Sequence, residues 1–383
     1  MIPKKKLLIA TDNFLPRWCG ISRFLSEIIP SLLKHYDVTV IAPDFGSFKP
    51  EGYRLVKIKK SRFGLGDYVA PKFSFRTVKR EVRKADLVFT QTIGPIGSLA
   101  IYYSKKLNKK VATYIHSLEW ELVPMSTRNI FLRKLLYPVS KMFTKFIYNK
   151  PDLLITPSGA LSDALAWRGI TTKKSIATLG VDCDIFKPIF GRTREELEEI
   201  NKLKEELGLE NSFVIGNHGR LANEKDLVTL LRAFKWFRKN HKNSKLLIVG
   251  DGLESIKNKF SGVEGCVLTG SKNNVHIYLN LMDVYVTSSL TETTSLTTLE
   301  AMASGLPVIS TPVGFIKEYI KNNKNGLIFN QKHSFELFKK LESVKRDSKR
   351  ASKLGFNARE TVLIDFHWNV TSKKIVEALR NLS

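Results

Sequence analysis

A segment near residue 300 constrains the fold of this chain more than any other part of it. Residues 284–289, VYVTSS, have the β-branched and aromatic bias of a buried strand, and residues 296–304, LTTLEAMAS, favour a helix. The turn between them, 291–295, therefore presents the unpaired N–H groups of a helix start, which attract an anion such as a diphosphate. Gly305 and Pro307 end the helix and lead into a second strand, VIST.

Cap-type side chains and two carboxylates belong to the same segment. Thr293, Thr294 and Ser295 are residues of the kind that cap helices, so we expect the helix to begin near Ser295. Glu292 stands just before the helix and Glu300 about one and a half turns inside it, so the two do not share one helical stripe. They are placed to grip different parts of one extended ligand. From spacing alone, a strand–helix–strand unit with solvated glutamates is an equally good interpretation.

The segment also resembles a family motif. ETTSLTTLEAMASGLPVI, residues 292–309, is similar to the E-x7-E motif of retaining family 4 glycosyltransferases, usually E-G-F-G-L-x-x-L-E-A-M-A-x-G-x-P-V-I. Both glutamates match, as do Leu296 and the run from Leu299 to Ile309. The three residues before Leu296 replace the usual Gly-Phe-Gly beside the sugar and phosphates. The resemblance implies retaining transfer from a nucleotide sugar, and the departure leaves the sugar and the nucleotide open.

Two cations follow a predicted strand in GNHGRLANEKD, residues 216–226. Arg220 follows the strand and Lys225 stands at the predicted start of a helix, so both charges and the helix N–H groups face one spot that suits a nucleotide diphosphate. Surface charges near a helix start are the alternative. The resemblance favours phosphate binding, because the family's G-R-L-x-x-E-K pattern is matched at Gly219, Arg220, Leu221, Glu224 and Lys225.

The resemblance implies a role for each residue of this second-domain site. Glu300 would hold the ribose hydroxyls, Glu292 the donor-sugar hydroxyls, and the backbone around Leu296 and Thr297 the distal phosphate. Lys272, after Gly270, falls where the family holds the base, although the pattern there is weak.

The first domain contributes two further candidates by resemblance. Gly20 would approach the diphosphate, at a place where the family usually has Gly-Gly and where Cys19 takes the first position here. His116 ends the strand 111–116 and matches the family's aromatic-x-His step. It would orient the acceptor or the sugar, whereas a lone histidine without that resemblance is more often structural.

Cleavage of the glycosyl–phosphate bond develops negative charge on the leaving phosphate. Arg220 and Lys225 would oppose that charge, with Glu292 and His116 as the other catalytic candidates. The resemblance implies same-face attack, with the donor phosphate accepting the acceptor proton. We find no His-x-x-x-His and recognise no tight ligand cluster. The prediction is therefore metal-independent transfer with a nucleotide-diphosphate sugar as co-substrate and no cofactor.

Strands and helices alternate along most of the chain, whose 383 residues suffice for two cores. The segment 6–43 reads as an opening βαβ unit of a parallel sheet. Further strands are predicted at 55–60, 86–91, 111–116 and 152–158, and again from FVIGNHGRL onward. The resemblance, which extends to LGVDCDIF and to DFHWNV near the C-terminus, implies an α/β GT-B fold. That fold has two doubly wound, Rossmann-like domains facing across a cleft, with a C-terminal helix crossing back to the first.

We predict an N-terminal acceptor-side domain over 1–190, joined by the C-terminal helix 369–383, and a nucleotide-sugar-binding domain over 191–368. The formal net charge is +26. Residues 1–190 hold 32 Lys and Arg against 14 Asp and Glu, and the remainder holds 30 against 22. Such an excess in the first half attracts polyanions, whether phospholipid head groups, nucleic acid or phosphorylated acceptors.

Residues 128–150, RNIFLRKLLYPVSKMFTKFIYNK, form a basic amphipathic helix in this prediction, which Pro138 could kink. Lys134, Lys141 and Lys145 lie off an apolar face, and such a helix with aromatic residues can lie in a membrane interface. A helix that covers the first-domain sheet, with solvated lysines, is the alternative. The apolar face consists of Phe131, Leu132, Leu135, Leu136, Val139, Met142, Phe143, Phe146 and Ile147.

The leading hypothesis is transfer of a hexose to a membrane lipid, with an anionic membrane surface or lipid acceptor as partner. A soluble or polysaccharide acceptor is the alternative. A nucleic-acid-binding protein is disfavoured, because no recognisable motif supports it and the E-x7-E site would have no use.

The N-terminus lacks a signal-peptide core, no apolar run could span a bilayer, and three dispersed cysteines suit a reducing compartment. We therefore expect a cytoplasmic enzyme, peripheral on the inner face of the cell membrane, of undetermined oligomeric state.

Overall fold

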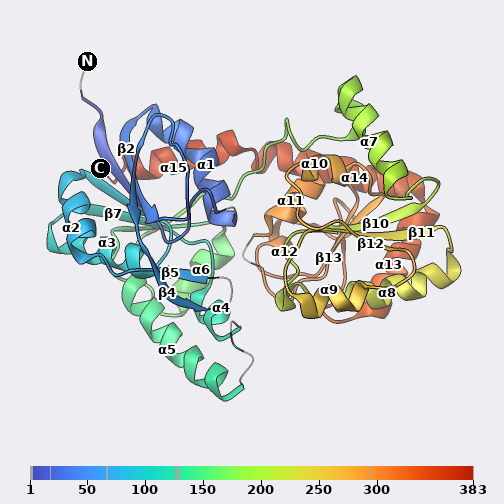
Figure 1. Cartoon of the computed structure of the whole chain (residues 1–383), viewed down its shortest axis with the longest axis horizontal. Coiled ribbons are helices and arrows are strands. Elements are labelled where there is room, and N and C mark those ends of the chain that lie inside the picture. The colour runs from blue at the N-terminus through green and yellow to red at the C-terminus, as the bar shows by residue number, and fades with distance from the viewer. Residues whose placement is uncertain are drawn as a thin grey trace. The chain divides into compact units, whose positions relative to one another are not determined.

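The structure is a computed structural model. It describes residues 3–17, 19–65, 68–125, 127, 130–292 and 294–382, without the side chains of 62–65, 68 and 125. The chain divides into two compact units, one formed by Met1–Leu179 with Trp368–Ser383 and the other by Gly180–His367 (Figure 1). Each unit is an α/β sheet covered by helices, as the alternating pattern of the sequence predicts.

The first unit is built on a seven-stranded parallel sheet in the order β3-β2-β1-β6-β7-β8-β9, with a separate β4–β5 hairpin. Its elements in chain order are β1 (Lys5–Ala10), α1 (Gly20–Leu33), β2 (Tyr36–Pro43), β3 (Arg54–Ile58), β4 (Lys60–Leu65), β5 (Tyr68–Pro71), α2 (Phe75–Lys84), β6 (Leu87–Thr90), α3 (Pro95–Lys106), β7 (Lys110–Tyr114), α4 (Glu119–Met125), α5 (Ile130–Tyr148), β8 (Leu153–Thr156), α6 (Gly159–Trp167), β9 (Lys174–Ile176) and α15 (Trp368–Arg380).

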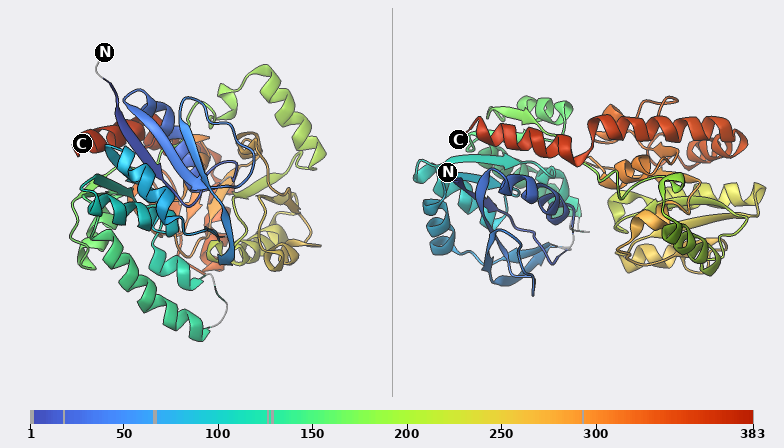
Figure 2. Two further views of the ribbon diagram at one scale, coloured as in Figure 1. Left: turned by 60° about the vertical axis from the view of Figure 1, so that its left-hand side comes forward. Right: turned by 90° about the horizontal axis from the view of Figure 1, so that it is seen from above.

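The C-terminal helix α15 packs on α1 of the first unit, which Figure 2 shows from two sides. Trp368, at the start of α15, is buried, and its ring lies 5.9 Å from the ring of Phe24 on α1. A buried aromatic pair of this kind contributes both apolar area and a favourable edge contact. The last helix therefore belongs to the first unit although it is far from it in sequence.

The second unit has a six-stranded parallel sheet in the order β12-β11-β10-β13-β14-β15. Its elements are the 3-10 turn η1 (Ile189–Gly191), α7 (Arg194–Glu206), β10 (Phe213–His218), the 3-10 turn η2 (Asn223–Lys225), α8 (Leu227–Asn240), β11 (Ser244–Val249), α9 (Glu254–Phe260), β12 (Cys266–Leu268), α10 (Val275–Leu279), β13 (Val284–Thr287), α11 (Leu296–Ala303), β14 (Val308–Ser310), α12 (Ile316–Tyr319), β15 (Leu327–Ile328), α13 (Ser334–Arg346) and α14 (Ser348–Asp365).

Both faces of this sheet are covered, so the centres of its strands are largely apolar. On β11, Leu246 and Ile248 belong to one core cluster, and Leu247 and Val249 belong to the other. Successive residues of a strand point to opposite faces, and a parallel sheet has helices on each. This explains why LLIV reads as a continuous apolar run rather than as an alternating one.

The compact units and the predicted domains differ in the segment 180–190. Val181, Cys183 and Phe186 pack in a core cluster of the second unit, so that segment is grouped with it rather than with the first. The β4–β5 hairpin and β9 are not anticipated by the sequence pattern. The sequence of β4, KSRFGL, lacks the alternation of apolar and polar residues that marks a strand. β9, with the sequence KSI, is only three residues long.

Candidate active site

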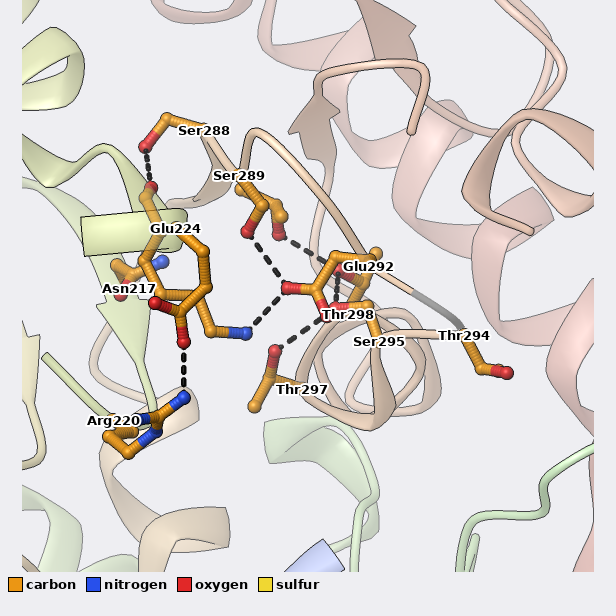
Figure 3. Close-up of polar contacts among 12 residues, drawn as sticks. Asn217, Arg220, Glu224, Ser288, Ser289, Glu292, Thr294, Ser295, Thr297 and Thr298 are labelled. Carbon is orange, nitrogen blue, oxygen red and sulfur yellow. Dashed lines mark hydrogen bonds and ion pairs between the residues drawn. The ribbon is translucent and has the colours of Figure 1, made fainter. Parts of the chain in front are cut away.

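The candidate site lies where the order of strands in the second sheet changes direction along the chain. β10 pairs with β11 on one side and with β13 on the other, and both pairings are parallel. In open α/β sheets such a switch point, at the carboxyl ends of the strands, is where ligands bind. The segments that follow β10 and β13 hold all the second-domain candidates except Lys272 (Figure 3).

The helix after β13 begins where the sequence predicts. Ser295 has φ 61°, and α11 runs from Leu296 to Ala303 before Gly305, whose φ is +75°. The predicted capping is wrong in one respect, because the Ser295 hydroxyl bonds the hydroxyl of Thr298 at 2.8 Å instead of a helix N–H. Among the described residues none accepts a hydrogen bond from the N–H groups of Leu296 and Thr297. Thr293, also predicted to cap, lies outside the described residues.

Glu292, in the loop after β13, forms an ion pair with Lys225, in the loop after β10. Lys225 Nζ lies 2.5 Å from Glu292 Oε1, and the Ser289 hydroxyl donates to the same oxygen at 2.8 Å. Both charged side chains are largely buried. Two buried opposite charges hold each other in fixed positions, because separating them would leave each one uncompensated. The carboxylate and the ammonium are therefore preorganised before any ligand arrives.

Arg220 has a different partner from Lys225. Its guanidinium forms an ion pair with Glu224, and the side chain is 54% exposed (Figure 3). Lys225 ends the turn η2, and α8 begins two residues later with Leu227. The prediction that Lys225 stands at the start of a helix is thus wrong by two residues. Asp226, in the left-handed conformation at φ 43°, separates the turn from the helix, and each of the two cations forms an ion pair with a different carboxylate.

Backbone contacts hold the two loops together. The Ser288 hydroxyl donates to the carbonyl oxygens of Lys225 and Asp226 at 2.9 and 3.1 Å, and Leu290 N donates to Glu224 O at 2.7 Å. The segment after β13 is therefore fastened to the turn after β10 by several hydrogen bonds. Residues far apart in sequence form one rigid platform at the switch point.

Glu300 is 2% exposed, on the inner side of α11. Its Oε2 lies 2.6 Å from Nε2 of His218, the last residue of β10. His218 is a site residue that the sequence patterns missed. The available signal was a histidine at the end of a strand that begins with an apolar run, directly before Gly219 and Arg220.

The positions of Lys272 and Gly20 do not test the donor contacts that the family pattern assigns to them. Lys272 is exposed in the loop after β12, with its ammonium 6.0 Å from the centre of the Tyr278 ring. Gly20 is the first residue of α1, and a Cβ added there would meet nothing within 4 Å. Packing among the described residues therefore does not require a glycine at position 20.

His116 lies just past the end of β7, in the first unit. Its Nε2 is 2.9 Å from Oε1 of Gln91, and its ring packs against Phe24 and Tyr114 at 4.8 and 4.6 Å. Burial lowers the pKa of His116 to about 3, so the ring is neutral at physiological pH. A neutral imidazole with one nitrogen engaged is suited to hydrogen bonding rather than to carrying charge.

Glu119, three residues further on, is a partly buried acid that the sequence patterns also missed. The Tyr148 hydroxyl lies 2.9 Å from both of its carboxyl oxygens, and the Ser117 hydroxyl lies 3.5 Å from Oε1. Burial raises the pKa of Glu119 from 4.5 to about 7, against the opposing effect of these hydrogen bonds. Glu119 and Tyr148 connect α4 to the last residue of α5.

This pKa shift predicts a pH dependence of stability. Between pH about 4.5 and about 7 the unfolded carboxyl is ionised while the folded one holds its proton, so Glu119 destabilises the fold as pH rises, by roughly 3 kcal/mol in total. Glu119→Gln removes this titration. In thermal unfolding at pH 5 and pH 8, we expect the variant to gain stability relative to the parent at pH 8. An equal difference between the two proteins at both pH values would contradict the shift.

The helix predicted over 128–150 is observed as α5, continuous through Pro138. Its buried residues are Ser140, Thr144, Ile147 and Tyr148, whereas Phe131 is 79% exposed and Met142 71% exposed. Arg128 and Asn129, at the start of the predicted segment, lie outside the described residues. The alternative in which the apolar face covers the sheet is therefore wrong for most of that face. Its exposed members are Phe131, Leu132, Leu135, Val139, Met142, Phe143 and Phe146.

The lysines of α5 lie beside this exposed face. Lys134, Lys141 and Lys145 are all exposed, and their spacing of seven and four residues places them along one flank of the helix. α4 packs along α5. Near the start of α5, the Arg133 guanidinium donates to Pro124 O and Thr127 O. The first unit thus presents a supported helix with an apolar face and a basic flank, and Figure 1 shows α5 extending away from the sheet of that unit.

Two features are absent from the part of the chain that the structure describes. No helix in this part of the chain is both long enough and apolar enough to cross a bilayer. Within the same residues, no three His, Cys, Asp or Glu side chains are grouped as they would be around a metal ion.

Comparison with known proteins defines the class of this chain. Residues 18–185 match the family model described as Glycosyltransferase Family 4, and residues 199–361 match the model described as Glycosyl transferases group 1. The chain belongs to this group 1, family 4 class of glycosyltransferases. It is therefore a nucleotide-sugar-dependent hexosyltransferase, which confirms the class predicted from the E-x7-E motif.

Curated relatives agree with this class, and solved structures share its fold. The alpha-monoglucosyldiacylglycerol synthase of Acholeplasma laidlawii is 28% identical over 305 residues, 73% of each chain. The GDP-mannose-dependent alpha-(1-6)-phosphatidylinositol monomannoside mannosyltransferase of Mycobacterium tuberculosis is 23% identical over 401 residues, 98% of each. Anabaena HepE, solved in complex with UDP-glucose, aligns with a TM-score of 0.77 at 18% identity, over 99% of this chain and 100% of that one.

A further structural neighbour is WaaG, a glycosyltransferase involved in lipopolysaccharide biosynthesis. It aligns with a TM-score of 0.76 at 15% identity, over 97% of this chain and 99% of that one. At such identities the likeness concerns the fold alone. It confirms the predicted GT-B fold over nearly the whole chain.

Proposed function

We propose that this glycosyltransferase moves a hexose from a nucleotide-diphosphate sugar to a membrane lipid, while bound peripherally to an anionic membrane surface on the cytoplasmic side. The observation that carries this proposal is the exposed apolar face of α5 with its flank of three lysines. Aromatic and apolar side chains enter the interfacial layer of a bilayer, and lysines beside them contact anionic head groups. The names of two relatives, a diacylglycerol glucosyltransferase and a phosphatidylinositol mannoside mannosyltransferase, support a lipid acceptor.

The reaction proceeds with retention and without a metal in this proposal. The acceptor hydroxyl attacks the anomeric carbon from the face that the diphosphate leaves, and its proton passes to a donor phosphate oxygen. Lys225, Arg220 and the N–H groups of Leu296 and Thr297 oppose the charge that grows on the leaving phosphate. The pairs of Lys225 with Glu292 and of Arg220 with Glu224 hold the cations until the diphosphate competes for them.

In this proposal the two glutamates of the motif bind different parts of the nucleotide sugar. Glu292 takes the hydroxyls of the sugar and Glu300 those of the ribose, which suits one carboxylate in a loop and one inside a helix. His116, neutral and held by Gln91, orients the acceptor or the sugar. The donor contacts assigned to Gly20 and Lys272 stay predictions from the family pattern.

A transfer assay tests the acceptor directly. The purified protein is incubated with UDP-glucose or GDP-mannose and with vesicles of phosphatidylglycerol that contain diacylglycerol or phosphatidylinositol. We expect radiolabelled sugar in the organic phase, together with nucleotide release that rises when the vesicles are present. Label that stays in the aqueous phase on soluble glycans, with no effect of vesicles, would favour the soluble-acceptor alternative and contradict the proposal.

The division of roles predicts different defects for the two glutamates. Glu300→Gln should weaken binding of the free nucleoside diphosphate about tenfold or more, because a charged hydrogen-bond acceptor is lost. Glu292→Gln should leave that binding nearly unchanged and should reduce transfer. Calorimetry with UDP and GDP, alongside the transfer assay, measures both effects. The reverse order of binding defects would exchange the two roles.

A further inference from the structure

The histidine that contacts Glu300 is buried as deeply as the carboxylate itself. His218 is 5% exposed and Glu300 is 2% exposed, and the distance between Nε2 and Oε2 is 2.6 Å. A buried carboxylate without a hydrogen-bond donor is costly, and a charge-assisted bond is strong in surroundings of low dielectric. Any rotation of the Glu300 side chain away from His218 would therefore be opposed.

Tyr285 of β13 fixes the position of His218. Its ring centre lies 5.3 Å from that of the imidazole, and its hydroxyl donates to His218 O at 3.3 Å and accepts from His218 N at 3.5 Å. Burial raises the pKa of Tyr285, so the hydroxyl keeps the proton that it donates. Tyr285, His218 and Glu300 form a chain of contacts from β13 through β10 to α11.

The second ring nitrogen of His218 indicates the tautomer. Nδ1 is buried and has no hydrogen-bond partner among the described residues. A proton on Nε2 is donated to the carboxylate, whereas a second proton on Nδ1 would be a buried donor without an acceptor. The tautomer with its proton on Nε2 fits this geometry. A carboxylate offers about four acceptor positions, of which the bond to His218 uses one.

We propose that His218 is a positioning residue for nucleotide recognition, which holds the Glu300 carboxylate so that the site distinguishes a ribonucleotide from a 2′-deoxyribonucleotide. This inference rests on the proposed role of Glu300 at the ribose. A carboxylate fixed in one orientation meets the 2′-hydroxyl at a defined place, and a site built for a hydroxyl rejects an analogue that lacks it. A carboxylate free to rotate would accept both nucleotides with more similar affinity.

Calorimetric binding of UDP, dUDP, GDP and dGDP tests this inference on the full chain. We expect the parent to prefer the ribonucleotide about tenfold or more. His218→Leu should weaken ribonucleotide binding about tenfold to a hundredfold and change deoxyribonucleotide binding little, so the preference collapses. His218→Gln should restore the preference, because its terminal amide nitrogen can donate from nearly the same place as Nε2. Asn is too short for this, so His218→Asn should behave like His218→Leu.

A matched control comes from a second histidine–glutamate pair in the same unit. His241 Nε2 lies 3.0 Å from the carboxyl oxygens of Glu342, beside the amino end of β11 and so at the opposite edge of the sheet from the site. His241→Leu removes a comparable contact and should leave the nucleotide preference unchanged.

The outcomes separate the inference from the proposed function. A parent that binds ribo- and deoxyribonucleotides equally would overturn the role of Glu300 and the inference with it. A parent with the preference and a His218→Leu variant that retains it would overturn the inference alone. An equal loss for both nucleotide types would show that His218 only supports the fold. Should His218→Leu fail to fold, the contrast between His218→Gln and His218→Asn decides in the same way.

Discussion

Replacing Lys225 by Ala is expected to lower turnover by about a hundredfold or more, on the scale of losing one electrostatic contact to a transition state. Lys225 is held by Glu292 at 2.5 Å, so its ammonium is placed before the donor arrives. The proposed diphosphate exchanges for that carboxylate as charge grows on the leaving group. Arg220→Ala should lower turnover similarly, because its guanidinium is the second cation proposed to oppose the charge on the leaving phosphate. The side chain is 54% exposed and contributes little to the fold, so the variant should fold normally.

The measurement is steady-state nucleotide release and lipid glycosylation, with circular dichroism to compare the folds. Lys235→Ala is the matched control, because Lys235 is an exposed cation of α8, the helix that follows Lys225, with no place in the proposed site. Its turnover should equal that of the parent. Near-normal turnover in both Lys225→Ala and Arg220→Ala, with intact folds, would contradict the assignment of the phosphate site.

Reversing the charge of Lys134, Lys141 and Lys145 to Glu is expected to abolish sedimentation with phosphatidylglycerol vesicles at low salt. Each basic residue near an anionic surface contributes about 1 kcal/mol, so loss of three gives a decrease in binding of about a hundredfold before the new repulsion is counted. The same variant should transfer poorly to lipid and retain slow hydrolysis of the donor. For the parent, raising the salt from 0.1 M to 1 M should release the protein, because the Debye length falls from about 10 Å to about 3 Å.

Two further variants separate local contact from net charge. Lys242, Lys349 and Lys353 are exposed in the second unit, and their replacement by Glu makes the same change in net charge away from α5. That control should sediment like the parent. Phe131→Ser with Met142→Ser keeps every charge and removes two exposed apolar side chains, and it should also weaken binding. A charge-reversed α5 variant that sediments like the parent would contradict the membrane contact.

Local patterns in the sequence predict the centre of this protein well. The strand, turn and helix from Val284 to Ala303 occur within a few residues of their predicted bounds, because β-branched runs, helix-forming runs and a terminal glycine act over short distances. The same segment shows Glu292 in a turn and Glu300 inside a helix. The class of enzyme follows from this stretch together with the Gly219–Lys225 pattern.

The surface of α5 is a feature that local sequence patterns could not predict. Helical periodicity separates an apolar face from a basic flank, but it does not tell which side packs on the protein. The structure turns Ser140 and Thr144 inward and leaves Phe131 and Met142 in solvent. The small inward residues fit against the neighbouring elements of the first unit, whereas the larger apolar residues lie on the other side of the helix.

The partners of the site residues were decided only by tertiary structure. Lys225 and Glu292 are 67 positions apart, and His218 and Glu300 are 82 positions apart. They meet because β10 lies beside β13 in the sheet, although β11 and β12 come between them in the chain. Strand order depends on how whole helices and strands pack around one core, and no local pattern of residues carries that information. The sequence therefore determined which chemical groups are present at each strand end, and the packing of the sheet determined which of them touch.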